Sequence, residues 1–173
     1  MNRRVTSQDL LFVSKSPRKH IKMLRAGISL EHRTGYTISE ITGRVVADRL
    51  RLAKNTLEAA DQAATELNQN RMSIGRSYYA MYHAMRAVVF FVTDGDDYEE
   101  HMKLPIKVPS DFPTRTKWQN SLREARYARN RADYDPYPKK DASFKAEATD
   151  LRAEARELLK ISRQYLKCKG CPL

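Results

Sequence analysis

Two stretches of the 173-residue sequence combine arginine, tyrosine and histidine at spacings that place them on common helix faces. The first runs from Arg76 to Ala87 (RSYYAMYHAMRA) and the second from Arg129 to Asp135 (RNRADYD). Arginine forks bind phosphate oxygens, tyrosine rings stack on unpaired bases, and imidazoles transfer protons near neutral pH. These residue types indicate a site for RNA or a nucleotide.

In the helix that carries the first stretch, polar and aromatic residues fall on the side opposite its apolar residues. That side carries Arg76, Tyr79, His83, Arg86 and Phe90. Because Tyr79 and Phe90 would otherwise face water, the pattern predicts a dimer interface or a ligand cleft there. The alternative is a solvated face on which His83 is an ordinary surface histidine.

The second stretch belongs to a longer basic helix with two polar rows. One row carries Arg123, Tyr127, Asn130 and Tyr134, and the adjacent row carries Arg126, Arg129 and Asp133. Together with Arg131, these residues predict a surface that faces RNA. The alternative is a solvated helix braced by an Arg129–Asp133 pair at i,i+4, which is worth a few tenths of a kcal/mol.

Apolar repeats predict the elements that position these stretches. Apolar residues recur every three or four positions over about 42–69, 74–92, 114–135 and 142–166. The short polar break after residue 69 predicts an antiparallel helix pair, and Asp94-Gly95 and Pro136 are typical of helix ends. No convincing strand is present, so we expect an all-α fold, an antiparallel four-helix bundle.

The remaining segments have no such period. Residues 1–40 are basic with scattered apolar residues, which predicts an irregular, partly ordered N-terminal arm before a helical domain over 41–167. Residues 94–113 contain three prolines and predict a long connection between the second and third helices. Residues 168–173 predict an exposed tail, because Cys168 and Cys171 lack the further ligands of a zinc site.

The formal net charge is +11, from 32 Lys and Arg against 21 Asp and Glu. Residues 1–40 carry +5, residues 114–140 carry +5, and residues 94–113 carry −4. The concentration of positive charge in the third helix favours a polyanionic partner, and RNA fits the adjacent tyrosines.

The acidic loop from Asp94 to His101 lacks the spacing of a calcium loop. We therefore expect no metal and no cofactor, and a solvated loop that folds over the basic cleft when RNA is absent. The longest apolar run, Ala87 to Val92, falls far short of the roughly 20 residues that cross a bilayer. With no secretory signal pattern, we expect a cytoplasmic protein without a membrane partner.

The two stretches, in this order and separated by an acidic loop, resemble the HEPN superfamily (higher-eukaryote and prokaryote nucleotide-binding domains). The sequence is similar to a prokaryotic branch with YYAMYHA and R-x-x-ADY stretches, and the likeness covers about residues 44–166. The resemblance implies a helical bundle that forms homodimers through the helices bearing these stretches. In many members it also implies metal-independent RNA cleavage, as a toxin paired with a nucleotidyltransferase-type antitoxin or in antiviral defence.

Catalytic members of that superfamily carry an arginine, a polar residue, and then a histidine four to six positions after the arginine. Arg129 and Asn130 match the first two, but Tyr134 stands at the histidine position, and no histidine follows His101. Forming a phenolate at pH 7 costs an unperturbed tyrosine about 4 kcal/mol. We therefore expect a modified site in which Tyr134 donates a proton or binds phosphate and His83 supplies the imidazole.

The sequence thus supports three functions. The first is a ribonuclease with Arg129, Asn130, Tyr134 and His83 as catalytic residues. Its expected RNA- and phosphate-binding residues are Arg76, Arg86, Arg123, Arg126, Arg131, Tyr79 and Tyr127. The second is a non-catalytic module that binds RNA or a nucleotide and partners a nucleotidyltransferase or defence effector. The third is a purely structural helical dimer.

Overall fold

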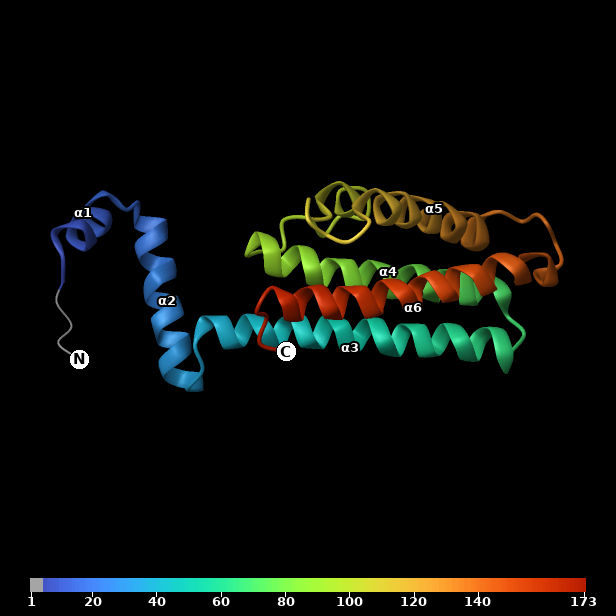
Figure 1. Cartoon of the computed structure of the whole chain (residues 1–173), viewed down its shortest axis with the longest axis horizontal. Coiled ribbons are helices and arrows are strands. Elements are labelled where there is room, and N and C mark those ends of the chain that lie inside the picture. The colour runs from blue at the N-terminus through green and yellow to red at the C-terminus, as the bar shows by residue number, and fades with distance from the viewer. Residues whose placement is uncertain (1–4) are drawn as a thin grey trace. The chain divides into compact units, whose positions relative to one another are not determined.

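The computed structural model describes residues 5–173, and within that range every regular element is a helix, which confirms the all-α class. The chain divides into two units, Met1–Ile41 and Thr42–Leu173. The second unit contains the polar stretches that the sequence analysis singled out, and its helices position them (Figure 1).

The second unit is a bundle of four long helices. They are α3 (Ile38–Thr65, of which the first turn belongs to the first unit), α4 (Asn70–Thr93), α5 (Arg115–Tyr134) and α6 (Lys145–Cys168). Successive helices run in opposite directions in Figure 1, as the short polar break predicted. Helix α4 is central: it packs against α5 and α6, and Ser73 donates from its hydroxyl to the carbonyl oxygen of Ala60 on α3 at 2.9 Å.

The predicted apolar repeats form the core. Val46, Leu50, Ala53 and Leu57 of α3 are buried, and Trp118 of α5 is fully buried. The predicted repeats are wrong at two helix ends: Val92, near the end of α4, is exposed, and the repeat shifts near the end of α3. Ala63 is buried in place of Ala64, and Leu67 is exposed beyond the last helical turn. The helix ends at Thr65, so the residues after it no longer follow the helical period.

The expectation of an irregular N-terminal arm is wrong for residues 7–34. These residues form α1 (Ser7–Lys15) and α2 (Arg18–Thr34). Thr6 and Asp9 form a capping box that starts α1, and Gly35 ends α2 with a φ of 71°, a left-handed conformation that glycine adopts without a steric cost. Local capping therefore supports helices in the arm.

The apolar residues of the arm share a groove within the first unit. The groove has a volume of about 550 Å³. It is lined by Phe12, His20, Met23, Leu24, Gly27, Ile28, Glu31 and Ile38. Neither α1 nor α2 contains a buried residue. Positions 24, 27, 28 and 31 follow the helical period, but Gly27 and Glu31 are not apolar, so the sequence shows no continuous apolar repeat there.

The connection between α4 and α5, which the sequence predicted only as a long segment without periodicity, is partly packed after its acidic residues. It contains a short 3-10 helix, η1 (Leu104–Lys107). Leu104, Val108 and Phe112 are buried in the core of the bundle. The second half of the connection is therefore held by apolar contacts that its prolines and acidic residues obscured in the sequence.

The C-terminal tail is also folded, and the expectation that it is exposed is wrong for Cys171. Cys168 is exposed, but Cys171 is buried, and its backbone N–H donates to the carbonyl oxygen of Leu166 at 3.0 Å. Pro172 lies where a side chain at Gly43 would stand. The glycine in α3 thus leaves room for the tail to pack against the bundle.

The corner between α5 and α6 is joined to the start of α4 by a carboxylate. Asp141 begins a second 3-10 helix, η2 (Asp141–Phe144). Its Oδ2 accepts from the backbone N–H of Asn70 at 2.6 Å, and its Oδ1 accepts from that of Arg71 at 3.0 Å. Asp141 therefore caps the first turn of α4, where backbone N–H groups have no partner within the helix.

Replacing Asp141 by alanine is expected to lower the free energy of unfolding by about 1–2 kcal/mol, because the N–H groups of Asn70 and Arg71 lose their acceptor. Urea denaturation measures this, with Asp150→Ala, an exposed aspartate on α6, as the control. An equal loss in both variants would contradict the capping role.

This stabilisation should depend on pH. Burial acts to raise the pKa of Asp141, but the hydrogen bonds from the Arg71 and Asn70 N–H groups outweigh it and lower that pKa. A lowered pKa in the folded state means that the stabilisation is complete above the ordinary carboxyl range and is lost as pH falls through the lowered value. The difference between wild type and Asp141→Ala should therefore shrink in strong acid.

Candidate functional site

Arg129 of α5 lies against α4, with its guanidinium held by three side chains. Nη2 donates to the hydroxyl oxygen of Tyr79 at 3.0 Å, and Nη1 donates to Oδ1 of Asn130 at 3.0 Å. Nε lies 2.8 Å from Oδ2 of Asp133, so the i,i+4 ion pair is present. A guanidinium has five N–H hydrogens, more than these acceptors take up, and it can still donate to a phosphate.

Two aromatic rings flank this guanidinium. The Cζ atom of Arg129 is 5.5 Å from the ring centroid of Tyr79 and 5.3 Å from that of Tyr134. At these distances a ring attracts a cation, which further restricts the orientation of the arginine. Tyr134 is 72% exposed and open to a ligand.

Two cavities border the residues around Arg129. One of about 200 Å³ is lined by Met72, Gly75, Arg76, Tyr79 and Asp133. The other, of about 440 Å³, is lined by Tyr127, Asn130, Arg131, Tyr134 and Asp135. Five of the predicted binding or catalytic residues besides Tyr79 therefore line concave surfaces beside the guanidinium.

His101, which the sequence analysis treated only as part of the acidic loop, lies in this site. Its Nδ1 is 2.5 Å from the hydroxyl oxygen of Tyr78, and its ring stacks on Tyr82 with centroids 4.3 Å apart. The ring of Tyr79 meets it edge-on at 5.9 Å. The loop after α4 thus brings an imidazole to the same tyrosine that Arg129 contacts.

The contact with Tyr78 orients the ring of His101. Burial raises the pKa of Tyr78 above its ordinary value, so the phenol stays protonated, and its hydroxyl donates to Nδ1 or accepts from it according to the tautomer of the ring. Burial, followed by the charges of Arg129 and Arg126, lowers the pKa of His101, and a bound phosphate would offset that positive field.

His83 is half-buried beside the same rings rather than on a solvated face. Its ring centroid is 6.4 Å from that of Tyr79 and 5.3 Å from that of Tyr82. Burial and the charges of Arg86, Arg49 and His101 lower the pKa of His83 to about 4. At neutral pH it is therefore an uncharged imidazole that can accept a proton.

The second face of α4, which we expected a partner chain or a ligand to cover, is partly covered by the chain's own loop. Asp96 forms ion pairs with Arg86 and with Arg49 of α3, and Glu99 lies 3.3 Å from Arg86. The Cζ atom of Arg49 stands 4.9 Å from the ring of Phe90. The acidic loop is thus attached to Arg49 and Arg86, as expected of a loop that folds over basic residues.

The other predicted binding residues differ in exposure and in their contacts. Arg76, Arg123 and Tyr127 are exposed, and Arg126 is half-buried. Arg131 forms an ion pair with Glu147 of α6, and its Cζ atom lies 5.7 Å from the ring of Phe144. Arg131 is therefore tied to the α5–α6 side of the bundle.

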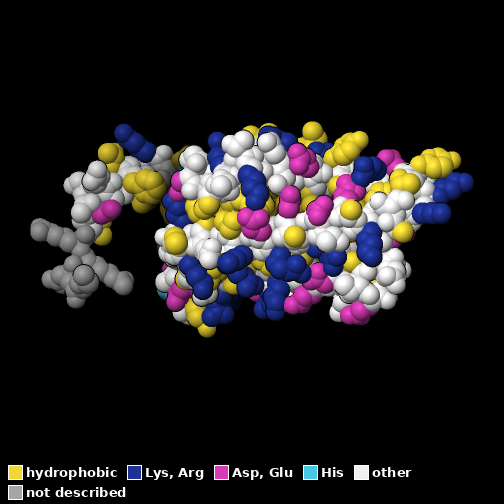
Figure 2. All heavy atoms as spheres, turned by 45° about the vertical axis from the view of Figure 1, so that its right-hand side comes forward, with side chains coloured by type: hydrophobic (Ala, Val, Ile, Leu, Met, Phe, Trp, Pro, Cys, Tyr) yellow, Lys and Arg dark blue, Asp and Glu magenta, His cyan; other side chains and the backbone are white. Residues whose placement is uncertain are grey.

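Charge on the bundle surface is mixed. On the face in Figure 2, Lys and Arg side chains are interleaved with Asp and Glu, so the positive excess does not form one continuous field there. Within residues 5–173, no group of three His, Cys, Asp or Glu side chains is arranged to hold a metal ion. None of the helices in the same range is long and apolar enough to span a bilayer.

Comparison with known proteins identifies one family. The sequence model of the family described as HEPN domain matches residues 46–165, which run from the buried face of α3 to the last turns of α6. No curated protein and no solved structure matched the chain. The match covers both stretches that carry the resemblance and the loop between them.

Proposed function

This chain belongs to the HEPN domain family, and we propose that it binds RNA and cleaves it without a metal ion at the site around Arg129. One observation carries the proposal. His101 packs against Tyr79, whose hydroxyl accepts a hydrogen bond from Arg129. The loop therefore supplies an imidazole close to Arg129 although Tyr134 occupies the superfamily's histidine position.

Two imidazoles and one guanidinium suffice for RNA cleavage by its own 2′-hydroxyl. Arg129 binds the scissile phosphate. Neutral His83 takes the proton of the 2′-hydroxyl, whose oxygen attacks phosphorus to form a 2′,3′-cyclic phosphate as the bond to the 5′-oxygen breaks. His101, protonated once the phosphate offsets the nearby arginines, gives its Nε2 proton to that leaving oxygen.

The remaining polar residues would orient the RNA. Asn130 holds the guanidinium of Arg129, and Tyr134 and Tyr127, 72% and 71% exposed, offer rings on which unpaired bases can stack. Arg76, Arg123 and Arg126 would contact neighbouring phosphates. The exposed side of α5 would also suit a second copy of the chain, and a nucleotidyltransferase-type antitoxin or defence effector is the partner that the family resemblance proposes.

A specific contact favours a second function, a module that binds RNA or a nucleotide without cleaving it. Asp133 lies 2.8 Å from Nε of Arg129 and neutralises part of the charge that a phosphate would need. In that case Tyr134 serves only for stacking, and the two histidines only shape the site.

Incubation of purified protein with labelled single-stranded RNA in EDTA separates these functions. We expect cleavage that persists in the chelator and leaves 2′,3′-cyclic phosphate ends. Tight, salt-sensitive binding without products would favour the non-cleaving module. Absence of both binding and cleavage at moderate salt would favour the structural dimer.

A further inference from the structure

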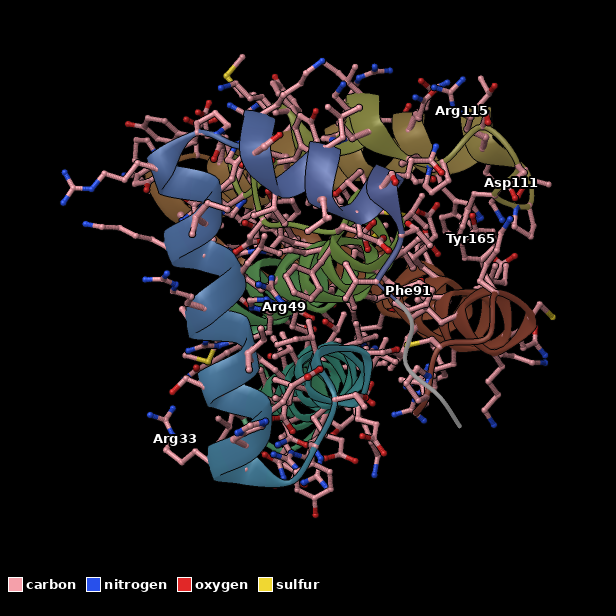
Figure 3. All side chains as sticks on the ribbon, turned by 90° about the vertical axis from the view of Figure 1, so that its left-hand side faces the viewer. Arg33, Arg49, Phe91, Asp111, Arg115 and Tyr165 are labelled. Atoms are coloured by element: carbon pink, nitrogen blue, oxygen red, sulfur yellow. The ribbon has the colours of Figure 1, made fainter. Side chains whose placement is uncertain are left out.

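Two arginines from different helices converge on one carboxylate next to the histidines. Arg86 of α4 donates from Nε to Oδ1 of Asp96 at 2.9 Å and from Nη2 to Oδ2. Arg49 of α3 donates from Nη2 to the same Oδ2 at 2.9 Å. In Figure 3, Arg49 is labelled in the region between α3 and α4. The two guanidiniums thus donate to the carboxylate oxygens as they would donate to the oxygens of a phosphate.

The arginines are positioned by aromatic rings as well as by Asp96. The Cζ atom of Arg49 is 4.9 Å from the ring of Phe90, and that of Arg86 is 5.8 Å from the ring of Tyr82. Both rings belong to α4, and the two side chains are only 19% and 21% exposed. Because two half-buried cations repel each other, this preformed pair requires an anion, from the chain or from a ligand.

Asp96 can leave the pair without removing His101 from the site. The loop has other attachments: the hydroxyl of Tyr82 donates to the carbonyl oxygen of Glu99, Tyr78 contacts His101, and the Glu99 carboxylate lies 3.3 Å from Nη2 of Arg86. None of them involves the Asp96 side chain. A ligand that displaces Asp96 therefore needs only a local rotation of that side chain, which is 34% exposed to solvent.

We propose that Arg49 and Arg86 form a second phosphate-binding subsite for RNA, which the Asp96 carboxylate occupies when RNA is absent. The inference rests on the proposed function, because it extends the same RNA path from Arg129 past His83. Arg86 follows His83 by one turn on α4, so a phosphate bound there belongs to a nucleotide neighbouring the scissile one. Asp96 acts as an internal competitor that RNA must displace.

The test compares Asp96→Asn with Asp97→Asn in the full chain. Both substitutions remove one carboxylate from the same loop, and Asp97 is exposed. Binding of a fluorescent single-stranded RNA and of short inorganic polyphosphate is measured over a salt series. We expect Asp96→Asn to tighten binding of both probes about tenfold, the effect of about one charged hydrogen bond, and Asp97→Asn to change it less than about twofold.

Two further readouts sharpen the comparison. Asp96→Asn should leave the slope of the salt dependence of RNA binding close to that of the wild type, because RNA makes the same phosphate contacts once it has displaced Asp96. Adding Arg49→Ala to Asp96→Asn should return the affinity for RNA to the wild-type level or below, because the subsite has then lost one of its two guanidinium groups. Thermal unfolding of each variant reports whether the loop and bundle remain folded.

The outcomes separate the subsite from the proposed function. Equal effects of Asp96→Asn and Asp97→Asn would reflect net charge alone and overturn the subsite, as would a lower melting temperature without tighter binding. If RNA is cleaved but Asp96→Asn binds no tighter, the subsite fails and the proposed function stands. If polyphosphate follows the expected pattern while RNA is neither bound nor cleaved, the subsite stands for phosphate and the RNA function fails.

Discussion

Arg129→Ala is expected to slow RNA cleavage by about 100- to 1,000-fold, since the group that binds the scissile phosphate and stabilises its charge in the transition state is removed. Arg129→Lys should recover only a small part of the rate. A single ammonium cannot contact Tyr79, Asn130 and Asp133 in the fixed directions of the guanidinium. Single-turnover cleavage of labelled RNA in EDTA measures both variants.

The matched control for Arg129 is Arg163→Ala, which removes the same charge from an exposed position on α6. We expect its cleavage rate to stay close to wild type, because an exposed charge on another helix is screened by salt and is not held against the site. Comparable losses in the two variants would mean that Arg129 acts only through net charge. Undiminished cleavage by Arg129→Ala would remove it from the catalytic site.

His101→Ala is expected to slow cleavage by about 100-fold or more, the usual contribution of a positioned general acid. The variant should also change the pH dependence. In the wild type, the rate falls in acid as His83, with its pKa of about 4, becomes protonated and can no longer act as a base. It falls on the alkaline side of the optimum, as the pH rises through the pKa of His101 and the proton that the leaving oxygen needs is lost. This alkaline decline should be absent in His101→Ala.

His32→Ala is the control for His101, because His32 is an exposed histidine of α2 in the other unit of the chain. Its pH profile should match that of the wild type. An unchanged alkaline decline in His101→Ala would assign the general acid to another group, of which Tyr134 beside Arg129 is the first to examine. Circular dichroism checks that the loop substitution leaves the helical content intact.

The bundle was predictable because its signals are local and repeated. Val46, Leu50, Ala53 and Leu57 recur with the helical period over several turns, and each repeat reinforces the assignment. The predicted end of the third helix before Pro136 is confirmed, since α5 ends at Tyr134. The helices of the N-terminal arm were not predicted because the positions of α2 that line the groove include Gly27 and Glu31 and therefore form no continuous apolar repeat.

The sequence by itself determined the helices of the bundle and the rows on which Arg129, Asn130 and Tyr134 lie, because neighbours along a helix have a set spacing. Only the tertiary structure decided that His101 and Asp96 belong with them. Both lie in a connection without periodicity, whose course depends on burying Leu104, Val108 and Phe112 in the bundle. Contacts between residues distant in sequence, such as Asp96 with Arg49, follow from that packing, and no local sequence pattern predicts them.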